Sequence, residues 1–143
     1  MCGIIGCINL NLTNEEKNNS LNFLKHRGPD DQNFYENRTD KYSIFFAHNR
    51  LEILDISDGK QPMTSSDGRY VVIFNGEIYN FRELRKELEA AGHIFKSDHS
   101  DTEVLIHGYK QWGENLSLHL NGMWAFAILD NKENKLFLSR DRF

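Results

Sequence analysis

The chain has 143 residues, of which 39% are hydrophobic and 12% aromatic, enough for about one globular domain with its own core. Seventeen basic residues against 21 acidic ones give a formal net charge of −4, and Lys/Arg runs are no longer than two residues, which argues against nucleic-acid and membrane-surface partners. The longest apolar run, Met123 to Leu129, is too short to span a bilayer and no signal peptide opens the chain, so we expect a cytoplasmic protein.

The N-terminus carries the first candidate for chemistry. Removal of Met1 would leave Cys2 with both a thiol and a free α-amine, whose pKa of about 8 lets it accept the thiol's proton. A nucleophile with an adjacent base is the arrangement that acyl transfer requires. The alternative is an ordinary buried thiol, because residues 3–9 are apolar on both faces and predict a buried strand.

A helix and two strands are predicted next. A capping box formed by Thr13 and Glu16 begins a helix that ends before Gly28. Residues 43–48 and 51–56 are also predicted to form strands.

Polar residues at the ends of the predicted strands form the second group of candidates. Alternation places His48 and Arg50 on one face, where Arg50 could bind a carboxylate or could simply be a surface side chain. A further strand over residues 70–74 runs into Asn75 and Gly76. These two residues could supply hydrogen-bond donors to an oxyanion, or form a common strand-to-loop turn.

Two more helices are predicted from capping boxes. Asn80 with Glu83 begins one helix, and Ser100 with Glu103 begins the other. Asp101 therefore falls in the first turn of the second helix, where it could bind a ligand or only complement the helix dipole.

The last part of the chain completes the predicted fold. A short helical stretch passes through Leu116 and Leu120, and residues 123–130 and 136–140 predict a hairpin. Strands, then helices, then strands again indicate an α+β fold with mostly antiparallel sheet rather than a doubly wound one. Residues 139–143 carry no stop signal, so we expect a C-terminally truncated domain.

Seven short segments, taken together and in this order, match one family. They are Met1-Cys2-Gly3-Ile4-Ile5-Gly6, Arg27-Gly28-Pro29-Asp30, Arg50-Leu51 with Asp55, Gln61-Pro62-Met63, Phe74-Asn75-Gly76-Glu77-Ile78-Tyr79-Asn80, Ser100-Asp101-Thr102-Glu103 and Gly122-Met123-Trp124-Ala125-Phe126-Ala127. The chain resembles the glutaminase domain of class II glutamine amidotransferases, most of all that of the glutamine-hydrolysing asparagine synthetases.

The resemblance implies a fold and a set of catalytic residues. The fold would be that of an N-terminal nucleophile (Ntn) hydrolase, an αββα sandwich of two antiparallel sheets between helical layers, with residues 1–143 forming one truncated glutaminase domain. Cys2 would attack the side-chain amide carbon of glutamine. The Asn75 side-chain amide and the Gly76 N–H would hold the oxyanion and contact the substrate.

The resemblance also implies how the substrate is bound. Arg50 would bind the α-carboxylate of glutamine, and Glu77 and Asp101 its α-ammonium group. The backbone around Ile53 and Leu54 would line the same pocket, the loop of residues 27–30 would lie beside it, and no metal would be needed.

The implied activity is glutamine hydrolysis that supplies ammonia to an ATP-dependent synthetase domain, which makes asparagine from aspartate. L-glutamine and that domain, absent here, would be the partners, and the resemblance allows a homodimer. No cofactor is expected in this segment, whereas ATP and Mg²⁺ are expected in the synthetase domain. Two alternatives stay open: ammonia donation to a sugar or peptide carboxylate, or a non-catalytic glutamine-binding module if Met1 is retained.

Overall fold

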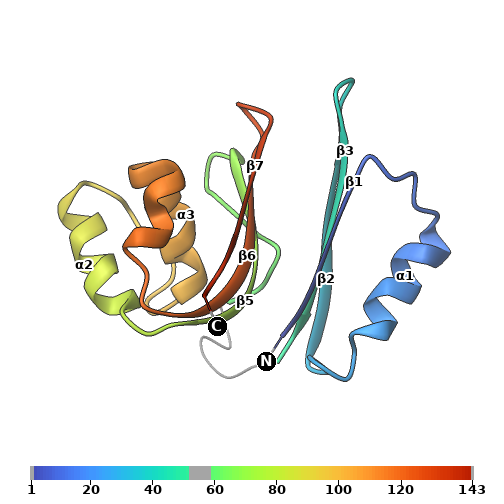
Figure 1. Cartoon of the computed structure of the whole chain (residues 1–143), viewed down its shortest axis with the longest axis horizontal. Helices are drawn as coiled ribbons and strands as arrows, with labels where there is room; N and C mark the ends of the chain where they lie inside the picture. The colour runs from blue at the N-terminus through green and yellow to red at the C-terminus, as the bar shows by residue number, and fades with distance from the viewer. Residues whose placement is uncertain (1, 52–58, 143) are drawn as a thin grey trace.

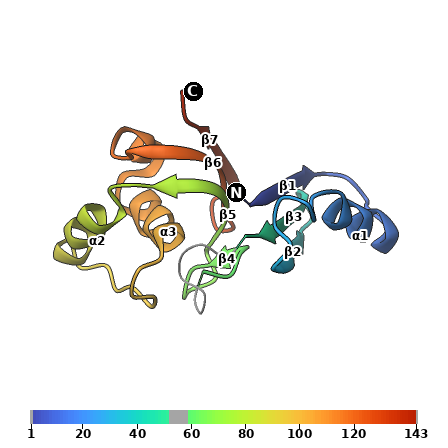
Figure 2. The same ribbon diagram turned by 90° about the horizontal axis from the view of Figure 1, so that it is seen from below.

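The computed structural model describes residues 2–51 and 59–142, and its elements form four layers, helix–sheet–sheet–helix (Figures 1 and 2). One sheet has three strands in the order β1-β3-β2, with the bounds β1 Gly3–Ile8, β2 Asp31–Arg38 and β3 Ser43–Arg50. The other has four in the order β4-β5-β6-β7, with the bounds β4 Met63–Thr64, β5 Tyr70–Ile78, β6 Gly122–Asp130 and β7 Lys135–Arg140. The helices are α1 Asn14–Phe23, α2 Phe81–Ala90, α3 Asp101–Trp112 and the 3₁₀ helix η1 Gly113–Leu118. All strand pairs are antiparallel, so the α+β sandwich predicted from the sequence is confirmed.

Three apolar clusters hold the layers together. Between the sheets, Ile44 and Phe46 of β3 pack in one cluster with Val71 and Ile73 of β5. Alternate residues of β3 face the other way, toward α1. The largest cluster lies between the second sheet and the helices α2 and α3, which cover its outer face in Figure 1. The helix α3 is thereby fixed against β5, which matters for the site below.

All three predicted helix starts are confirmed, but the predicted side-chain capping is not found at each of them. The Thr13 hydroxyl accepts from Glu16 N at 3.2 Å, and Thr13 N donates to the Glu16 carboxylate at 2.7 Å. Ser100 caps α3 by accepting from Glu103 N, but the Glu103 carboxylate binds Lys96 N and Ser97 instead of Ser100 N, so only half of the predicted capping box is present. The capping box predicted at Asn80 is wrong, because its side chain instead donates to the His119 carbonyl and accepts from Asn121 N.

The strands differ from the prediction at β2, at β4 and at the Asn75-Gly76 pair. The strand β2 was not predicted, since its sequence is mostly polar and it lies at a sheet edge. The two-residue strand β4 was not predicted either. The strand predicted over residues 51–56 lies outside the described residues apart from Leu51, which is not part of a strand.

The third difference concerns the Asn75-Gly76 pair. The strand β5 does not end at Phe74 but continues to Ile78, because Gly76 pairs with Trp124 on β6. A Cβ at position 76 would lie 2.1 Å from the carbonyl oxygen of Met123, so only glycine fits there. The glycine serves a close approach of two strands rather than a turn.

Helices long and apolar enough to cross a membrane are not found in the part of the chain that the structure describes.

Candidate active site

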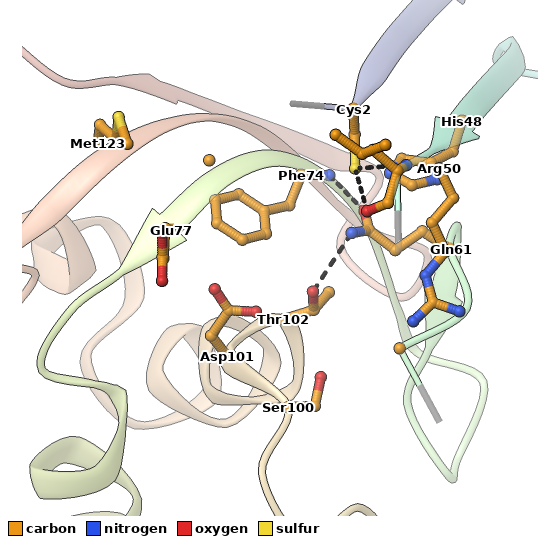
Figure 3. Close-up of a pocket in the computed structure, with 13 residues that line it drawn as sticks. Cys2, His48, Arg50, Gln61, Phe74, Glu77, Ser100, Asp101, Thr102 and Met123 are labelled. Atoms are coloured by element: carbon orange, nitrogen blue, oxygen red, sulfur yellow. Dashed lines mark hydrogen bonds between the residues drawn. The ribbon is translucent and has the colours of Figure 1, made fainter. Parts of the chain in front are cut away.

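A cavity of about 90 Å³ lies where one end of each sheet meets the first turn of α3 (Figure 3). It brings together five of the predicted site residues, which come from four separate segments of the chain: Cys2, Arg50, Gly76, Glu77 and Asp101. Asn75 is not among the residues that line it, and Ile53 and Leu54 lie outside the described residues.

Cys2 precedes β1 and is held by neighbours on both sides. Its Sγ accepts from Leu51 N at 3.4 Å and lies 3.8 Å from the Leu51 carbonyl oxygen. Its own carbonyl accepts from Arg27 Nε at 3.2 Å. The thiol is half-buried, so it faces the cavity without being sealed from it.

The loop of residues 27–30 lies beside Cys2 and Arg50, where the family resemblance puts it. A Cβ on Gly28 would be 2.3 Å from the Asn49 carbonyl oxygen, so the loop packs directly on β3. Asp30 N donates to the Arg50 carbonyl oxygen at 3.1 Å, which ties the loop to the strand end that carries Arg50.

Arg50 and two carboxylates place opposite charges on the wall of the same cavity. Arg50 is the last residue of β3 and its side chain is buried with 4% exposure, contrary to a surface role. Glu77 and Asp101 come from β5 and α3. A cavity with one fixed cation and two carboxylates suits a ligand that carries both charges.

Asp101 is a carboxyl with a shifted pKa. Burial raises its pKa from 3.8 to about 6, with a further contribution from the charge of Glu77, although Ile78 N donates to its Oδ2 at 3.3 Å. A cation bound next to this carboxyl would stabilise its ionised form. Carboxyls whose pKa is raised by burial and by a second carboxyl are common in ligand-binding sites.

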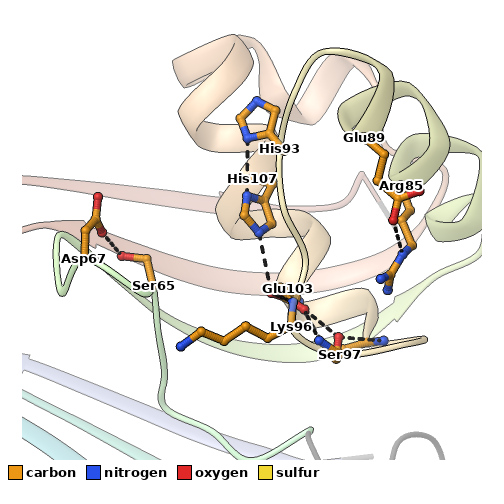
Figure 4. A network of polar contacts seen from close by, with 10 residues as sticks. Ser65, Asp67, Arg85, Glu89, His93, Lys96, Ser97, Glu103 and His107 are labelled. Carbon is orange, nitrogen blue, oxygen red and sulfur yellow. Dashed lines mark hydrogen bonds and ion pairs between the residues drawn. The ribbon is translucent and has the colours of Figure 1, made fainter.

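The first turn of α3 is held in place by a separate polar network around Glu103 (Figure 4). Its carboxylate accepts from Lys96 N at 2.8 Å, from Ser97 N at 2.9 Å and from Ser97 Oγ at 2.6 Å, and lies 3.5 Å from His107 Nε2. Burial acts to raise the pKa of Glu103, but these hydrogen bonds outweigh it and lower the pKa to about 2. The network fixes the segment that leads into Asp101.

Gln61 lines the cavity and was not predicted as a site residue. Its side chain is buried, accepts from Phe74 N at 2.6 Å and donates to Thr102 Oγ1 at 3.3 Å. The pairing of β4 with β5 ends at Met63 and Val72. Beyond it, the Gln61 side chain binds the backbone N–H of Phe74 in β5, as a neighbouring strand would, and also links β5 to α3. Local sequence periodicity contains no signal for this role.

His48 also lines the cavity, on the same face of β3 as Arg50, as the alternation predicts. Its side chain is 1% exposed, and burial lowers its pKa to about 4, so the ring is neutral at physiological pH.

Asn75 lies one residue from the cavity, along β5. It lines an adjoining hollow together with Gly76, Met123 and Trp124. Its Oδ1 is buried without a hydrogen-bond partner among the described residues. The structure therefore places Asn75 beside the cavity that holds Cys2, and its oxyanion role stays a prediction.

The described ranges contain no group of three or more His, Cys, Asp or Glu residues that could hold a metal ion. The cavity wall combines one arginine, two carboxylates and a thiol.

Comparisons with known proteins find relatives of this chain over its whole length. The model of the glutamine amidotransferase domain family matches residues 1–143. The chain is 45% identical to the glutamine-hydrolyzing asparagine synthetase 3 of Bacillus subtilis, over 99% of this chain and 23% of that one. It is 36% identical to the glutamine-hydrolyzing asparagine synthetase 1 of Arabidopsis thaliana, over 99% of this chain and 24% of that one.

A solved structure is also similar. The glutamine phosphoribosylpyrophosphate amidotransferase of Bacillus subtilis has a TM-score of 0.53 and 26% identity, over 68% of this chain and 23% of that one. The chain spans about a quarter of the length of these relatives.

Proposed function

Because the chain belongs to the class II glutamine amidotransferase family and is related to the asparagine synthetases, we propose that it hydrolyses L-glutamine to glutamate and ammonia with Cys2 as nucleophile. The observation that carries this proposal is the shared cavity. Arg50 offers a cation for the α-carboxylate, Glu77 and Asp101 offer carboxylates for the α-ammonium group, and the Cys2 thiol lines the same wall.

In the first half of the reaction, the α-amine of Cys2, freed by removal of Met1, takes the proton of the thiol. The sulfur attacks the side-chain amide carbon and a tetrahedral oxyanion forms. The Asn75 amide and Gly76 N–H stabilise it, at about 3 kcal/mol for each donor. The carbon–nitrogen bond then breaks, the amine passes its proton to the leaving group, and ammonia departs from a glutamyl thioester.

In the second half, water replaces ammonia. The α-amine takes a proton from water as its oxygen attacks the thioester carbon, and the same two donors stabilise the second oxyanion. The carbon–sulfur bond breaks, the proton returns to sulfur, and glutamate leaves.

In the longer protein, we assign the ammonia to ATP-dependent synthesis of asparagine from aspartate, in the cytoplasm. ATP and Mg²⁺ belong to the synthetase domain in this proposal, and no step of glutamine hydrolysis runs through them. Full-length protein given glutamine, aspartate and ATP should form asparagine. Ammonia release without asparagine would instead indicate another acceptor, such as a sugar or peptide carboxylate.

The glutaminase reaction is tested by incubating the protein with glutamine and measuring ammonia, after intact mass has established that Met1 is removed. Cys2→Ala should abolish ammonia release. Cys7→Ala is the matched control, because Cys7 packs in the cluster between the first sheet and α1. Ammonia release by the Cys2→Ala protein would refute the proposal, and a chain that keeps Met1 should bind glutamine without hydrolysing it.

A further inference from the structure

The backbone of β5 directs alternate residues to different neighbours, as in any antiparallel strand. The Tyr70 carbonyl oxygen accepts from Ser65 N, just after β4. Tyr79 N donates to the carbonyl oxygen of Asn121, just before β6. The backbone groups of even-numbered residues of β5 therefore face the β4 side, and those of odd-numbered residues face β6.

Side chains bind the β4 side of β5 where the pairing with β4 stops. That pairing ends at Val72. Phe74, the next even-numbered residue, donates its N–H to Gln61 Oε1 at 2.6 Å (Figure 3). Further along, Ile78 donates its N–H to Asp101 Oδ2 at 3.3 Å. Two side-chain acceptors thus take the place of a neighbouring strand along this edge.

Gly76 lies between these two bound N–H groups. It is also even-numbered, so its N–H points to the same edge, and Gly76 lines the cavity. The proposed function assigns this N–H to the oxyanion. A bulge or extra twist at Phe74 would turn the N–H of Gly76 to another direction, so the donor depends on what holds Phe74.

Gln61 holds Phe74 through a buried amide of fixed orientation. The N–H of Phe74 requires an acceptor, so the carboxamide presents Oε1 to it, and Nε2 then donates to Thr102 Oγ1 at 3.3 Å. Thr102 is buried in the first turn of α3, a helix that packs on β5 through the largest apolar cluster. The Thr102 hydroxyl therefore fixes which end of the Gln61 amide faces β5.

We propose that Gln61 is a positioning residue for the oxyanion: by accepting from Phe74 N, it keeps β5 extended beyond β4 and directs the N–H of Gly76 into the cavity. The inference rests on the proposed glutaminase function and deepens it. Gln61 acts through the backbone of β5 rather than on the bound substrate. Since the oxyanion exists only after the thiol has attacked, loss of Gln61 should slow the reaction without weakening the binding of glutamine.

Gln61→Met removes the acceptor and keeps a side chain of similar length. It should lower kcat/KM for glutamine by about tenfold to a hundredfold. In the Cys2→Ala protein, the same substitution should leave the Kd of glutamine within about threefold. A loss in Kd as large as the loss in kcat/KM would overturn the proposal, because Gln61 would then support the binding of glutamine instead.

Asn131→Ala is the control for lost stability alone. It removes a side-chain acceptor of Asn37 and Tyr42 just after β6, whereas the cavity lies at the other end of that strand. Its kcat/KM should stay within about twofold of the wild type. An equal fall in both variants would overturn the role of Gln61.

Alkylation by iodoacetamide separates the thiol from the oxyanion. The sulfur of Cys2 displaces iodide from a saturated carbon, so no oxyanion forms. The rate at Cys2, followed by peptide mass, should be within about twofold in Gln61→Met and the wild type. If alkylation slowed as much as glutamine hydrolysis, the substitution would be acting on the nucleophile, and the proposal would fail.

A further measurement needs no Gln61 variant. In the Cys2→Ala protein without Met1 or glutamine, amide hydrogen exchange followed by NMR should be slower at Phe74 than at Gly76. Thr102→Val, which removes the group that orients the Gln61 amide, should speed exchange at Phe74, and Thr102→Ser should restore it. Exchange at Phe74 as fast as at Gly76 in the parent Cys2→Ala protein would overturn the inference.

The two proposals fail in different ways. Without ammonia release by the wild-type protein, both fall. If ammonia is released but Gln61→Met leaves kcat/KM unchanged, only the role of Gln61 falls.

Discussion

The two ends of the β-sandwich treat polar groups in opposite ways. At one end, Asn131 lies between the sheets, and its Oδ1 accepts from Tyr35, Asn37 and Tyr42 at 3.1 to 3.4 Å, while its Nδ2 donates to the Gly68 carbonyl oxygen at 3.1 Å. We call this group the inter-sheet clamp. At the other end, around the cavity, His48 Nε2 and Asn75 Oδ1 have no partner among the described residues.

The ionisable groups differ in the same direction. Asp130, beside the clamp, is buried, but Arg69 binds it through two hydrogen bonds of 2.7 and 3.0 Å, so its pKa stays below the ordinary value despite its burial. Asp101, at the cavity, has its pKa raised to about 6 by burial. The clamp satisfies its own polar groups and stabilises the sandwich, whereas the cavity leaves charge and hydrogen-bonding capacity for a ligand.

The largest effect is expected from a substitution that disrupts the backbone packing at the cavity end. Gly76→Ala places a Cβ 2.1 Å from the Met123 carbonyl oxygen. We expect a loss of about 2–4 kcal/mol in the free energy of unfolding and a loss of ammonia release of more than a hundredfold, measured by denaturant titration and an ammonia assay.

Gly68→Ala is the matched control for this change. Gly68 also has a positive φ, +70°, but no atom lies within 4 Å of its would-be Cβ. It should cost about 1 kcal/mol and leave ammonia release unchanged. Equal effects of the two substitutions would show that strain alone, rather than the close approach at the site, explains the first.

Asp101→Asn should separate binding from stability at the cavity. The folded-state pKa of Asp101 lies above the ordinary value of 3.8, so the fold favours the protonated carboxyl. Stability from this group is greatest below about pH 4 and falls as the pH rises to about 6. At pH 7 the Asn variant should therefore be more stable by an amount on the order of 1–3 kcal/mol.

The same substitution should raise KM for glutamine about 10- to 100-fold, because a charge-assisted contact to the ammonium group is lost. Thermal unfolding from pH 4 to 8 and steady-state kinetics measure the two effects. A variant less stable than the wild type at pH 7 would contradict this account of the site.

Asn131→Ala tests the clamp end, where we expect a loss of stability without a loss of activity. It removes one acceptor shared by three donors and should cost about 2 kcal/mol of unfolding free energy, while kcat/KM for glutamine stays within twofold of the wild type. A large loss of activity in the folded variant would show that the two ends are coupled.

The smallest effect concerns Glu103, whose network supports α3. Its folded-state pKa, about 2, lies below the ordinary value of 4.5, so its stabilisation is complete above pH 4.5 and is lost as the pH falls toward 2. Glu103→Gln should reduce the stability difference between pH 6 and pH 3, by about 1 kcal/mol once solvent screening is allowed for. Unfolding curves at both pH values measure this, and an unchanged difference would contradict it.

Local signals predicted much of this fold. The Thr13 and Ser100 caps and the β6–β7 hairpin depend on neighbouring residues, and the structure confirms them. The pairing of Gly76 with Trp124 depends on residues far apart in sequence, and it overrides the turn preference of Asn-Gly. The strand β2 escaped prediction because an edge strand need not show a hydrophobic pattern.

The same distinction holds for the site. Motifs identified Cys2, Arg50, Glu77 and Asp101, which the structure then brings to one cavity. The role of Gln61 could not be predicted, because its side chain bonds to a backbone N–H thirteen residues away and to Thr102, forty-one residues away.

The helix α3 contributes both to the cavity and to the core, and this limits which substitutions the core can accept. Its first turn presents Asp101 to the ligand, while Val104, Leu105 and Tyr109 fill the largest apolar cluster. A substitution that repacks this cluster would rotate or shift the helix, and the carboxylate would move with it. Under the proposed function, residues of this cluster that do not line the cavity also constrain the position of Asp101, and substitutions that repack the cluster should change glutamine affinity before they unfold the protein.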